Sequence, residues 1–352
     1  MSPNRALFYA QQLVEKYQID CTGLTILTEA ASGSYFFNPL IPIVANANSV
    51  MTFCKSTHYG NVEEIEKEMS DVYSELGYRD NYHFHTILNR KLLCKADIVT
   101  NSGHLRPLDD AFIGSLKDTA VIPLMWEPWE MREGEIDLLK AKERDILIMG
   151  TNEHAAPCDM RPYGLLTALH LMMEHKASIV DDRILIIGSQ PTLALPIEKG
   201  LKALDLACKR IGTDESKREI QKALEWANYI LVAEHSDNRL IIGKRGIIDT
   251  EIILANNICG VGVISGSVDT SSLLERGISV FPERVASYGY MSYSPCEIGP
   301  YGVMDLFAAG IKVGQTMANC RLSGMDVEAA AKCTLDEAPA LDLTGEWAWV
   351  KN

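Results

Sequence analysis

Short apolar runs alternate with amphipathic stretches along almost the whole chain. The runs are rich in Val, Ile and Leu, which is typical of strands buried in a parallel sheet. The stretches between them space their apolar residues as helices do. Strands that alternate with helices predict parallel sheets joined by right-handed crossovers. The expected strands are residues 24–28, 49–53, 96–101, 119–125 and 145–150, followed by 183–189, 207–211, 228–234, 258–265 and 278–282.

A long helical stretch, residues 159–180, separates the two series of strands. We therefore expect an α/β fold with two Rossmann-like, doubly wound parallel-sheet domains around an interdomain cleft. A second long helical stretch begins near residue 301 and is expected to cross back onto the first domain, and residues 334–352 are expected to lie along the surface as a tail. The expected domains are a Rossmann- or flavodoxin-like substrate domain, residues 1–158 and 300–352, and a Rossmann-like nucleotide-binding domain, residues 159–299.

The composition narrows the partners that the protein can have. A net charge of −14 argues against nucleic acid, because phosphate binding needs clustered Lys and Arg, but it allows a local basic pocket for a small anionic metabolite. Nine cysteines without a C-x-x-C pair favour reduced thiols over disulfides or zinc. No signal peptide is evident, and no run approaches the roughly 18 apolar residues of a membrane span. We expect a cytoplasmic protein with no nucleic-acid or membrane partner.

The segment "IDLLKAKERDILIMG" (136–150) leads through the helical stretch into "RILIIGS" (183–189), and "KRGIIDTEIIL" (244–254) follows a later strand. In this order of elements, residues 97–269 resemble the D-2-hydroxyacid dehydrogenases, the formate and glycerate dehydrogenase superfamily. The resemblance implies a homodimeric oxidoreductase that uses NAD or NADP on a small anionic hydroxy or keto metabolite. It also implies an arginine that holds the substrate carboxylate, and Arg245 matches that position.

The chain departs from this family at the glycine-rich turn. The family's turn is G-x-G-x-x-G, and here "GSQPTL" keeps only the first glycine. Pro191 removes an N–H that would help to hold an anion. The family has an acidic residue for the ribose hydroxyls at a position where this chain has Lys209 and Arg210. These basic residues favour the 2′-phosphate of NADP, or they are ordinary surface charges. The cofactor is expected near Gly188, Ser189, Gln190, Thr192, Lys209, Arg210, Glu234 and His235.

The family's late catalytic histidine is missing, because no histidine follows His235. Reduction of a ketone needs a positioned proton donor, so another residue must supply it. Ligands of open α/β sheets bind at the carboxyl ends of the strands. After 145–150, we expect His154 to act as acid and base with Glu153 orienting it, unless this segment only caps the next helix. After 96–101, His104 is a second expected acid and base and Arg106 an anion clamp, unless they are a loop histidine and a surface ion pair.

Other polar residues at the same strand ends are expected to bind substrate. The stretch "EAASGS" places a Gly/Ser turn before a helix, whose free N–H groups attract an anion; ordinary capping is the alternative. The tryptophans of "WEPWE" are expected to stack on a planar ligand or to pack between domains. Three loop histidines lack the short spacing of metal ligands, so no metal is expected. The expected substrate-binding residues are Glu29, Ser32, Gly33, Ser56, His58, Tyr59, Trp126, Glu127, Asn152 and Arg245.

Three functional hypotheses are consistent with these residues. The first is a hydroxyacid-dehydrogenase-like, NAD(P)-dependent oxidoreductase in which His104 or His154 replaces the missing histidine. The second keeps the fold but has no redox chemistry: a transferase, lyase or hydrolase that acts on a nucleotide-like or anionic metabolite held at "EAASGS". The third is a protein that binds a ligand or a partner without catalysis.

Overall fold

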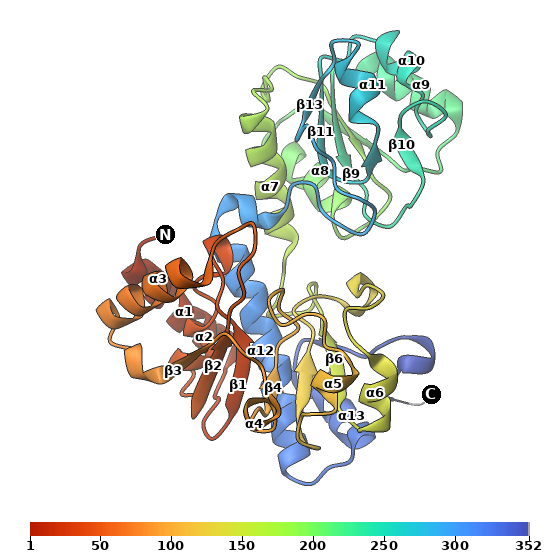
Figure 1. Cartoon of the computed structure of the whole chain (residues 1–352). Coiled ribbons are helices and arrows are strands. Elements are labelled where there is room, and N and C mark those ends of the chain that lie inside the picture. The colour runs from red at the N-terminus through yellow and green to blue at the C-terminus, as the bar shows by residue number, and fades with distance from the viewer. Residues whose placement is uncertain (351–352) are drawn as a thin grey trace. The chain divides into compact units, whose positions relative to one another are not determined.

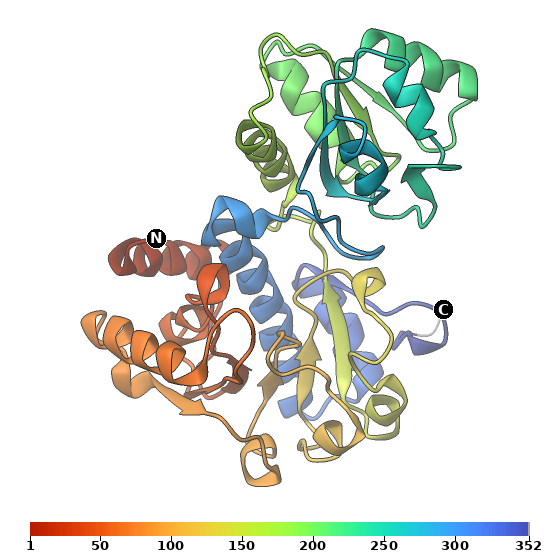
Figure 2. The same ribbon diagram turned by 45° about the horizontal axis from the view of Figure 1, so that its top comes forward.

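The chain consists of two compact units, which a computed structural model describes over residues 1–350. Unit 1 comprises Met1–Asp159 and the residues from Gly299 onward, and unit 2 comprises Met160–Ile298. Unit 2 is therefore inserted into the sequence of unit 1 (Figure 1). Each unit has a parallel sheet with helices beside it, which Figure 2 shows from a second direction.

Unit 1 is built from these elements. Its helices are α1 Pro3–Tyr17, α2 Leu40–Val44, α3 Val62–Glu75, α4 Arg90–Leu93, α5 Asp110–Ile113, α6 Leu138–Glu143, α12 Pro300–Leu322 and α13 Val327–Glu337, with 3₁₀ turns at Gly33–Tyr35, Arg79–Asn81, Pro128–Glu130 and Gly345–Trp347. Its strands are β1 Thr25–Glu29, β2 Ser49–Phe53, β3 Tyr82–His85, β4 Ile98–Val99, β5 Val121–Pro123, β6 Leu147–Thr151 and β14 Ala340–Leu341.

The strands of unit 1 form a seven-stranded sheet in the order β14-β6-β5-β4-β1-β2-β3. All neighbours pair in parallel except β14, which is antiparallel to β6. Without β14, this is the 3-2-1-4-5-6 order of dinucleotide-binding Rossmann sheets. The strand order reverses between β1 and β4, so their carboxyl ends form the switch point at which ligands of such sheets bind.

Helix α12 returns from the end of unit 2 and packs against β4, β5 and β6, as the sequence predicts. Two glycines permit the close approach: a Cβ at Gly310 would lie 2.5 Å from Met125 Cε, and one at Gly314 would lie 2.8 Å from Pro123 Cγ. The helix carries a buried carboxylate, Asp305, which accepts a hydrogen bond from Tyr17 Oη at 2.7 Å. This contact ties α12 to α1.

Unit 2 is built from a second set of elements. Its helices are α7 Arg161–Glu174, α8 Ala194–Ala203, α9 Lys217–Trp226, α10 Thr250–Leu254 and α11 Thr270–Leu274, with a 3₁₀ turn at Pro295–Ile298. Its strands are β7 Ile184–Ile187, β8 Cys208–Ile211, β9 Tyr229–Ala233, β10 Leu240–Ile242, β11 Gly260–Ser265, β12 Ser267–Val268 and β13 Ser279–Phe281.

The main sheet of unit 2 has five parallel strands in the order β13-β11-β9-β7-β8, and β10 and β12 form a separate pair. One face packs on α7 and α8, and the other on α9, α10 and α11. The sheet is thus doubly wound, but its order is the 2-1-3-4-5 of flavodoxin-like sheets. The dinucleotide-type order occurs in unit 1 instead.

The predicted α/β class with doubly wound parallel sheets is confirmed, and four short strands, β3, β10, β12 and β14, are additions to it. The predicted tail is partly built into the fold, because β14 pairs with β6 and Trp349 is buried beneath Lys142 Nζ, 3.5 Å from its ring centroid. Lys351 and Asn352, the end of that tail, lie outside the described residues. Among the helices of residues 1–350, none is long and apolar enough to cross a bilayer.

Candidate active site

The polar residues that follow β1, β2 and β4 meet at the carboxyl edge of the unit 1 sheet. Glu29, the last residue of β1, is buried and accepts a hydrogen bond from the backbone N–H of His104 at 3.0 Å. His104 Nδ1 accepts from the Lys55 N–H at 3.2 Å, and Lys55 Nζ donates to the Arg106 carbonyl at 2.9 Å. We call Glu29, Lys55, His104 and Arg106 the switch-point cluster, because β1 and β4 are the strands at which the order reverses.

The electrostatics of the switch-point cluster favour a neutral histidine beside cations. Burial and the charge of Lys55 lower the pKa of His104, so its ring is neutral at pH 7. Burial raises the pKa of Glu29, although the His104 N–H and the two cations oppose that shift. Arg106 and Arg132 both form ion pairs with Glu135, so two guanidinium groups lie together at this edge. The Arg106 guanidinium carbon also lies 4.8 Å from the centroid of the Trp126 ring.

A second group, which we call the carboxyl cluster, consists of Glu127, Glu130, Glu153 and His154 after β5 and β6. The Glu153 N–H donates to Glu127 Oε1 at 3.3 Å, and the Glu127 N–H donates to Glu130 Oε1 at 3.3 Å. His154 Nε2 lies 3.8 Å from Glu127 Oε1. The side chains of Glu130 and Glu153 are hydrogen-bonded to each other. Three carboxyls and an imidazole therefore converge at one place.

The Glu130–Glu153 pair holds a proton at neutral pH. Burial, together with the neighbouring Glu127, raises the pKa of Glu130 to about 7. Burial and the charges of Glu130 and Glu127 raise the pKa of Glu153 well above its ordinary value. Because two carboxyls that share a site cannot both ionise readily, Glu153 stays protonated and donates to the Glu130 carboxylate. A carboxylic acid that is protonated at pH 7 has the property that a general acid requires.

This shared proton predicts a pH dependence of stability. The pKa of Glu130 is raised in the folded state, so unfolding is assisted by its ionisation once the pH exceeds the unfolded value of about 4.3. We expect the free energy of unfolding to fall by at most about 4 kcal/mol from this group between about pH 4.3 and its folded pKa of about 7. Glu130→Gln should flatten that part of the profile in denaturant unfolding at several pH values. Parallel profiles for the two proteins would contradict the assignment.

The buried nitrogen atoms at this edge that have no hydrogen-bond partner within residues 1–350 include Asn101 Nδ2, Arg106 Nε, Trp126 Nε1 and His154 Nδ1. Buried polar groups in native proteins are nearly always hydrogen-bonded, to protein, to water or to a ligand. The atoms of Asn101, Arg106 and Trp126 are donors and follow β4 and β5. This edge is therefore suited to a ligand rich in acceptors, such as an anion.

The structure corrects the expectation of an anion site at the Ser32–Gly33 turn. The turn starts a 3₁₀ helix of three residues, Gly33–Tyr35, which is too short to hold an anion through its dipole. Ser32 Oγ donates to the Tyr59 carbonyl at 3.1 Å, and Gly33 takes a left-handed φ of 63°. These residues shape the loop, and of this stretch only Glu29 joins the cluster.

The remaining expected substrate residues of unit 1 have local roles. Ser56 Oγ accepts a hydrogen bond from the Val62 N–H at 3.2 Å. His58 and Tyr59 are exposed and contact each other, with their ring centroids 3.7 Å apart. Asn152 Oδ1 accepts from the His154 N–H at 3.0 Å, so Asn152 orients the segment that carries His154. Trp126 and Glu127, in contrast, lie in or beside the clusters.

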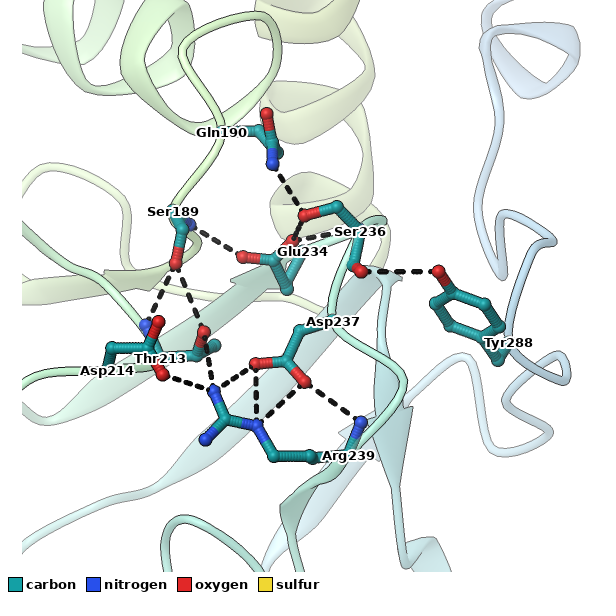
Figure 3. A network of polar contacts seen from close by, with 9 residues as sticks. All are labelled: Ser189, Gln190, Thr213, Asp214, Glu234, Ser236, Asp237, Arg239 and Tyr288. Atoms are coloured by element: carbon teal, nitrogen blue, oxygen red, sulfur yellow. Dashed lines mark hydrogen bonds and ion pairs between the residues drawn. The ribbon is translucent and has the colours of Figure 1, made fainter. Parts of the chain in front are cut away.

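In unit 2, the degenerate turn after β7 is bound to the carboxylate of Glu234, which follows β9 (Figure 3). The Ser189 N–H donates to Glu234 Oε2 at 2.7 Å, and Gln190 Nε2 donates to Ser236 Oγ at 2.6 Å. Burial raises the pKa of Glu234, but the carboxylate accepts two hydrogen bonds from Ser236 and one from Ser189, and these lower it further than burial raises it. Glu234 is therefore ionised. Gly188 is required by packing, because a Cβ there would lie 2.3 Å from the Ala233 carbonyl oxygen. Thr192 is partly exposed in the same turn.

Lys209 and Arg210 both have partners within the protein, so neither is left unpaired to meet a 2′-phosphate. Both lie within β8, so their side chains point to opposite faces of the strand. Lys209 Nζ lies 4.3 Å from the centroid of the Trp226 ring, and Arg210 pairs with Glu198 and donates to the Gly188 carbonyl. Asp214 follows the end of β8 instead.

Asp214 belongs to a polar pocket of about 370 Å³ at the ends of β7, β8 and β9. Its Oδ1 accepts from Arg239 Nη2 at 2.6 Å, and Asp237 binds the same guanidinium (Figure 3). Thr213 and Ser236 add hydroxyls to the lining. His235 is partly exposed directly after Glu234, and Arg245 is exposed in the loop after β10 with a left-handed φ of 66°.

Two functional candidates were not singled out from the sequence: Glu135 and Asp214. Glu135 occurs in "WEPWEMREGE", where the density of acidic residues is visible but the partner of each is not. Asp214 was not identified because the sequence indicated the strand at 207–211 only weakly, so the residues after its end were not considered. Among the residues that the structure describes, no group of three or more His, Cys, Asp or Glu side chains is arranged to hold a metal ion.

The fold therefore defines a two-unit α/β protein with a candidate acid–base centre in unit 1. No family model matches the chain, and no curated protein matches its sequence. Among solved structures, a dipicolinate synthase component from Bacillus halodurans has a TM-score of 0.50 at 9% identity, and the match covers 82% of this chain and 96% of that chain. That likeness shows a shared fold.

Dehydrogenases of the D-2-hydroxyacid type are also among the solved structures that match. D-2-hydroxyisocaproate dehydrogenase has a TM-score of 0.44 at 12% identity, with 86% of this chain and 98% of that chain covered. NAD⁺-bound 3-phosphoglycerate dehydrogenase from Entamoeba histolytica has a TM-score of 0.41 at 11% identity, with 86% and 96% covered.

Proposed function

We propose that the chain is a hydroxyacid-dehydrogenase-like oxidoreductase that uses NAD(P) on a small anionic hydroxy or keto metabolite. The observation that carries the proposal is the Glu130–Glu153 pair, which keeps a carboxylic acid protonated at neutral pH at the carboxyl edge of the unit 1 sheet. A reductase that lacks the family's late histidine needs such a proton donor. The resemblance of the sequence and the shared fold support the redox assignment.

The residues of unit 1 have distinct roles in this proposal. Arg106, whose buried Nε has no partner within residues 1–350, donates to the carboxylate of the metabolite. Glu153 gives its proton to the carbonyl oxygen of a keto substrate, and it takes that proton back when a hydroxy substrate is oxidised. In this proposal the roles expected from the sequence are exchanged: Glu153 is the acid, and His154, whose Nε2 lies 3.8 Å from Glu127 Oε1, is not.

The residues of unit 2 fit the ribose of NAD(P). When bound, reduced NAD(P) supplies a hydride for the carbonyl carbon. Asp214, whose side chain is 86% exposed, offers a carboxylate acceptor for ribose hydroxyls beside the Thr213 and Ser236 hydroxyls. Arg239 is held by Asp214 and Asp237, so no unpaired cation of this pocket is left to receive a 2′-phosphate. These charges favour NAD over NADP.

This preference can be measured by titrating the whole chain with NADH and NADPH and following nucleotide fluorescence. We expect NADH to bind roughly tenfold or more tightly than NADPH, because the phosphate would face two carboxylates. Asp214→Asn should narrow that difference. Asp205→Asn, at an exposed position before β8, is the matched control and should leave it unchanged. Equal binding of both nucleotides would refute the assigned ribose site.

A second candidate, a non-redox transferase, lyase or hydrolase, is favoured by one observation. The ionised Glu234 occupies the Ser189 N–H, and Pro191 has none, so the turn presents a negative charge where a dinucleotide pyrophosphate would need donors. The carboxyl cluster would then serve acid–base chemistry without a hydride. Failure of both nucleotides to bind, with stabilisation by small carboxylates that Arg106→Gln abolishes, would favour this candidate.

A further inference from the structure

A pocket of about 530 Å³ lies at the amino ends of β1 and β2 and extends along β3. Thr25 and Ser49, the first residues of β1 and β2, line it, whereas Glu29 and the switch-point cluster follow the opposite ends of these strands. Its volume is within the range of about 300–1,000 Å³ that is typical of small-molecule sites. It is therefore a separate cavity from the candidate active site.

The charged side chains that line this pocket are all basic. His83 and His85 of β3 face it together with Lys95 and Lys117, and no carboxylate is among the lining residues. Lys117 is ion-paired with the buried Asp97. The side chains of His83, His85 and Lys95 have no hydrogen-bond or ion-pair partner within residues 1–350. The pocket thus collects basic groups that the protein itself does not neutralise.

This collection is unusual for a chain with a net charge of −14, since a negative net charge disfavours anions. The basic groups also repel one another: burial, His83 and Lys95 lower the pKa of His85. An anion between them would remove that repulsion and accept hydrogen bonds from Lys95 and from the hydroxyls of Thr25 and Ser49.

We propose that this pocket binds a small polyvalent anion, one that carries a phosphate or several carboxylates. The site is independent of the proposed oxidoreductase function, because it shares no residue with the switch-point cluster or the carboxyl cluster. Binding should strengthen at acidic pH, where histidine gains its charge, and because the pKa of His85 is lowered, that histidine gains its charge below the ordinary range. The titratable and charged groups that face His85 in this pocket are His83, Cys94, Lys95 and Lys117, with Asp97 behind Lys117.

The test is a titration of the full chain with inorganic phosphate and with citrate, by calorimetry and thermal unfolding, at pH 6 and pH 8. Potassium chloride at matched ionic strength separates site binding from screening. We expect saturable binding that is stronger at pH 6. Lys95→Gln and His83→Gln, both at exposed positions, should each weaken it roughly tenfold, the effect of one lost charge-assisted hydrogen bond.

Lys91→Gln is the matched control, because Lys91 is exposed on the short helix α4, four residues before Lys95, but does not line the pocket. It should bind both anions as the wild type does. Tighter binding of citrate would identify a polycarboxylate ligand, and tighter binding of phosphate would identify a phosphorylated one. The proposal is overturned if neither anion binds beyond the chloride control, or if Lys95→Gln and His83→Gln bind like the wild type.

Discussion

Replacement of Glu153 by glutamine is expected to lower kcat by roughly 10²- to 10⁴-fold, the usual contribution of a general acid. Glutamine has almost the same shape and can still donate a hydrogen bond to Glu130, so unit 1 should stay folded. Because Glu153 acts on the reacting oxygen rather than on the substrate carboxylate, KM should change little. The measurement is steady-state kinetics in both directions with the metabolite that the chain oxidises.

Two further variants make this prediction specific. Glu133→Gln changes an exposed carboxylate in the same loop as Glu130 and should keep full turnover. His154→Gln should lower kcat less than Glu153→Gln, because His154 contacts Glu127 rather than the proton-sharing pair. A Glu153→Gln enzyme with the turnover of the wild type, or a larger loss in His154→Gln, would return the acid–base role to the histidine.

Replacement of Gly188 by alanine is expected to destabilise unit 2 by about 3 kcal/mol or more. The new Cβ would lie 2.3 Å from the Ala233 carbonyl oxygen and 2.7 Å from Ala194 Cβ, so β7, β9 and α8 would have to separate. Neither neighbour is the flexible end of a side chain. Thermal unfolding followed by calorimetry should show an earlier transition for unit 2.

The matched control is Gly164→Ala in helix α7 of the same unit. A Cβ there would meet only Leu193 Cδ1 at 3.3 Å, which is the end of a flexible side chain. Alanine in a helix interior should then be neutral or stabilise by up to about 1 kcal/mol. If Gly188→Ala unfolds like the wild type, the glycine has another role, such as close approach to a ligand.

The strand pattern was predictable wherever an apolar run is buried on both faces. The predicted strand 49–53 coincides with β2, and 228–234 contains β9. The sequence did not indicate β3, because "YHFH" alternates polar residues at the edge of the sheet, or β14, which has only two residues. The order of strands in each sheet could not be predicted from the sequence either, because an apolar run does not indicate which strand lies beside it.

Part of the candidate site was predictable because parallel strands end at the same edge. Glu29 and His104, separated by 75 residues, are joined by a hydrogen bond there. The proton shared by Glu153 and Glu130 depends on how the loop after β5 folds, which no spacing rule gives. The same applies to Arg210, whose partner Glu198 lies on α8. The homodimer and the cytoplasmic location stay predictions.

The insertion of unit 2 between β6 and α12 sets an order of synthesis. Domains generally fold as units, the N-terminal one first, while the ribosome adds residues. Here the ribosome finishes residues 160–298 before it makes α12 and β14, which cover and extend the first sheet. The unit that begins the chain is therefore the last to be completed, and its sheet lacks α12 and β14 while the inserted unit folds.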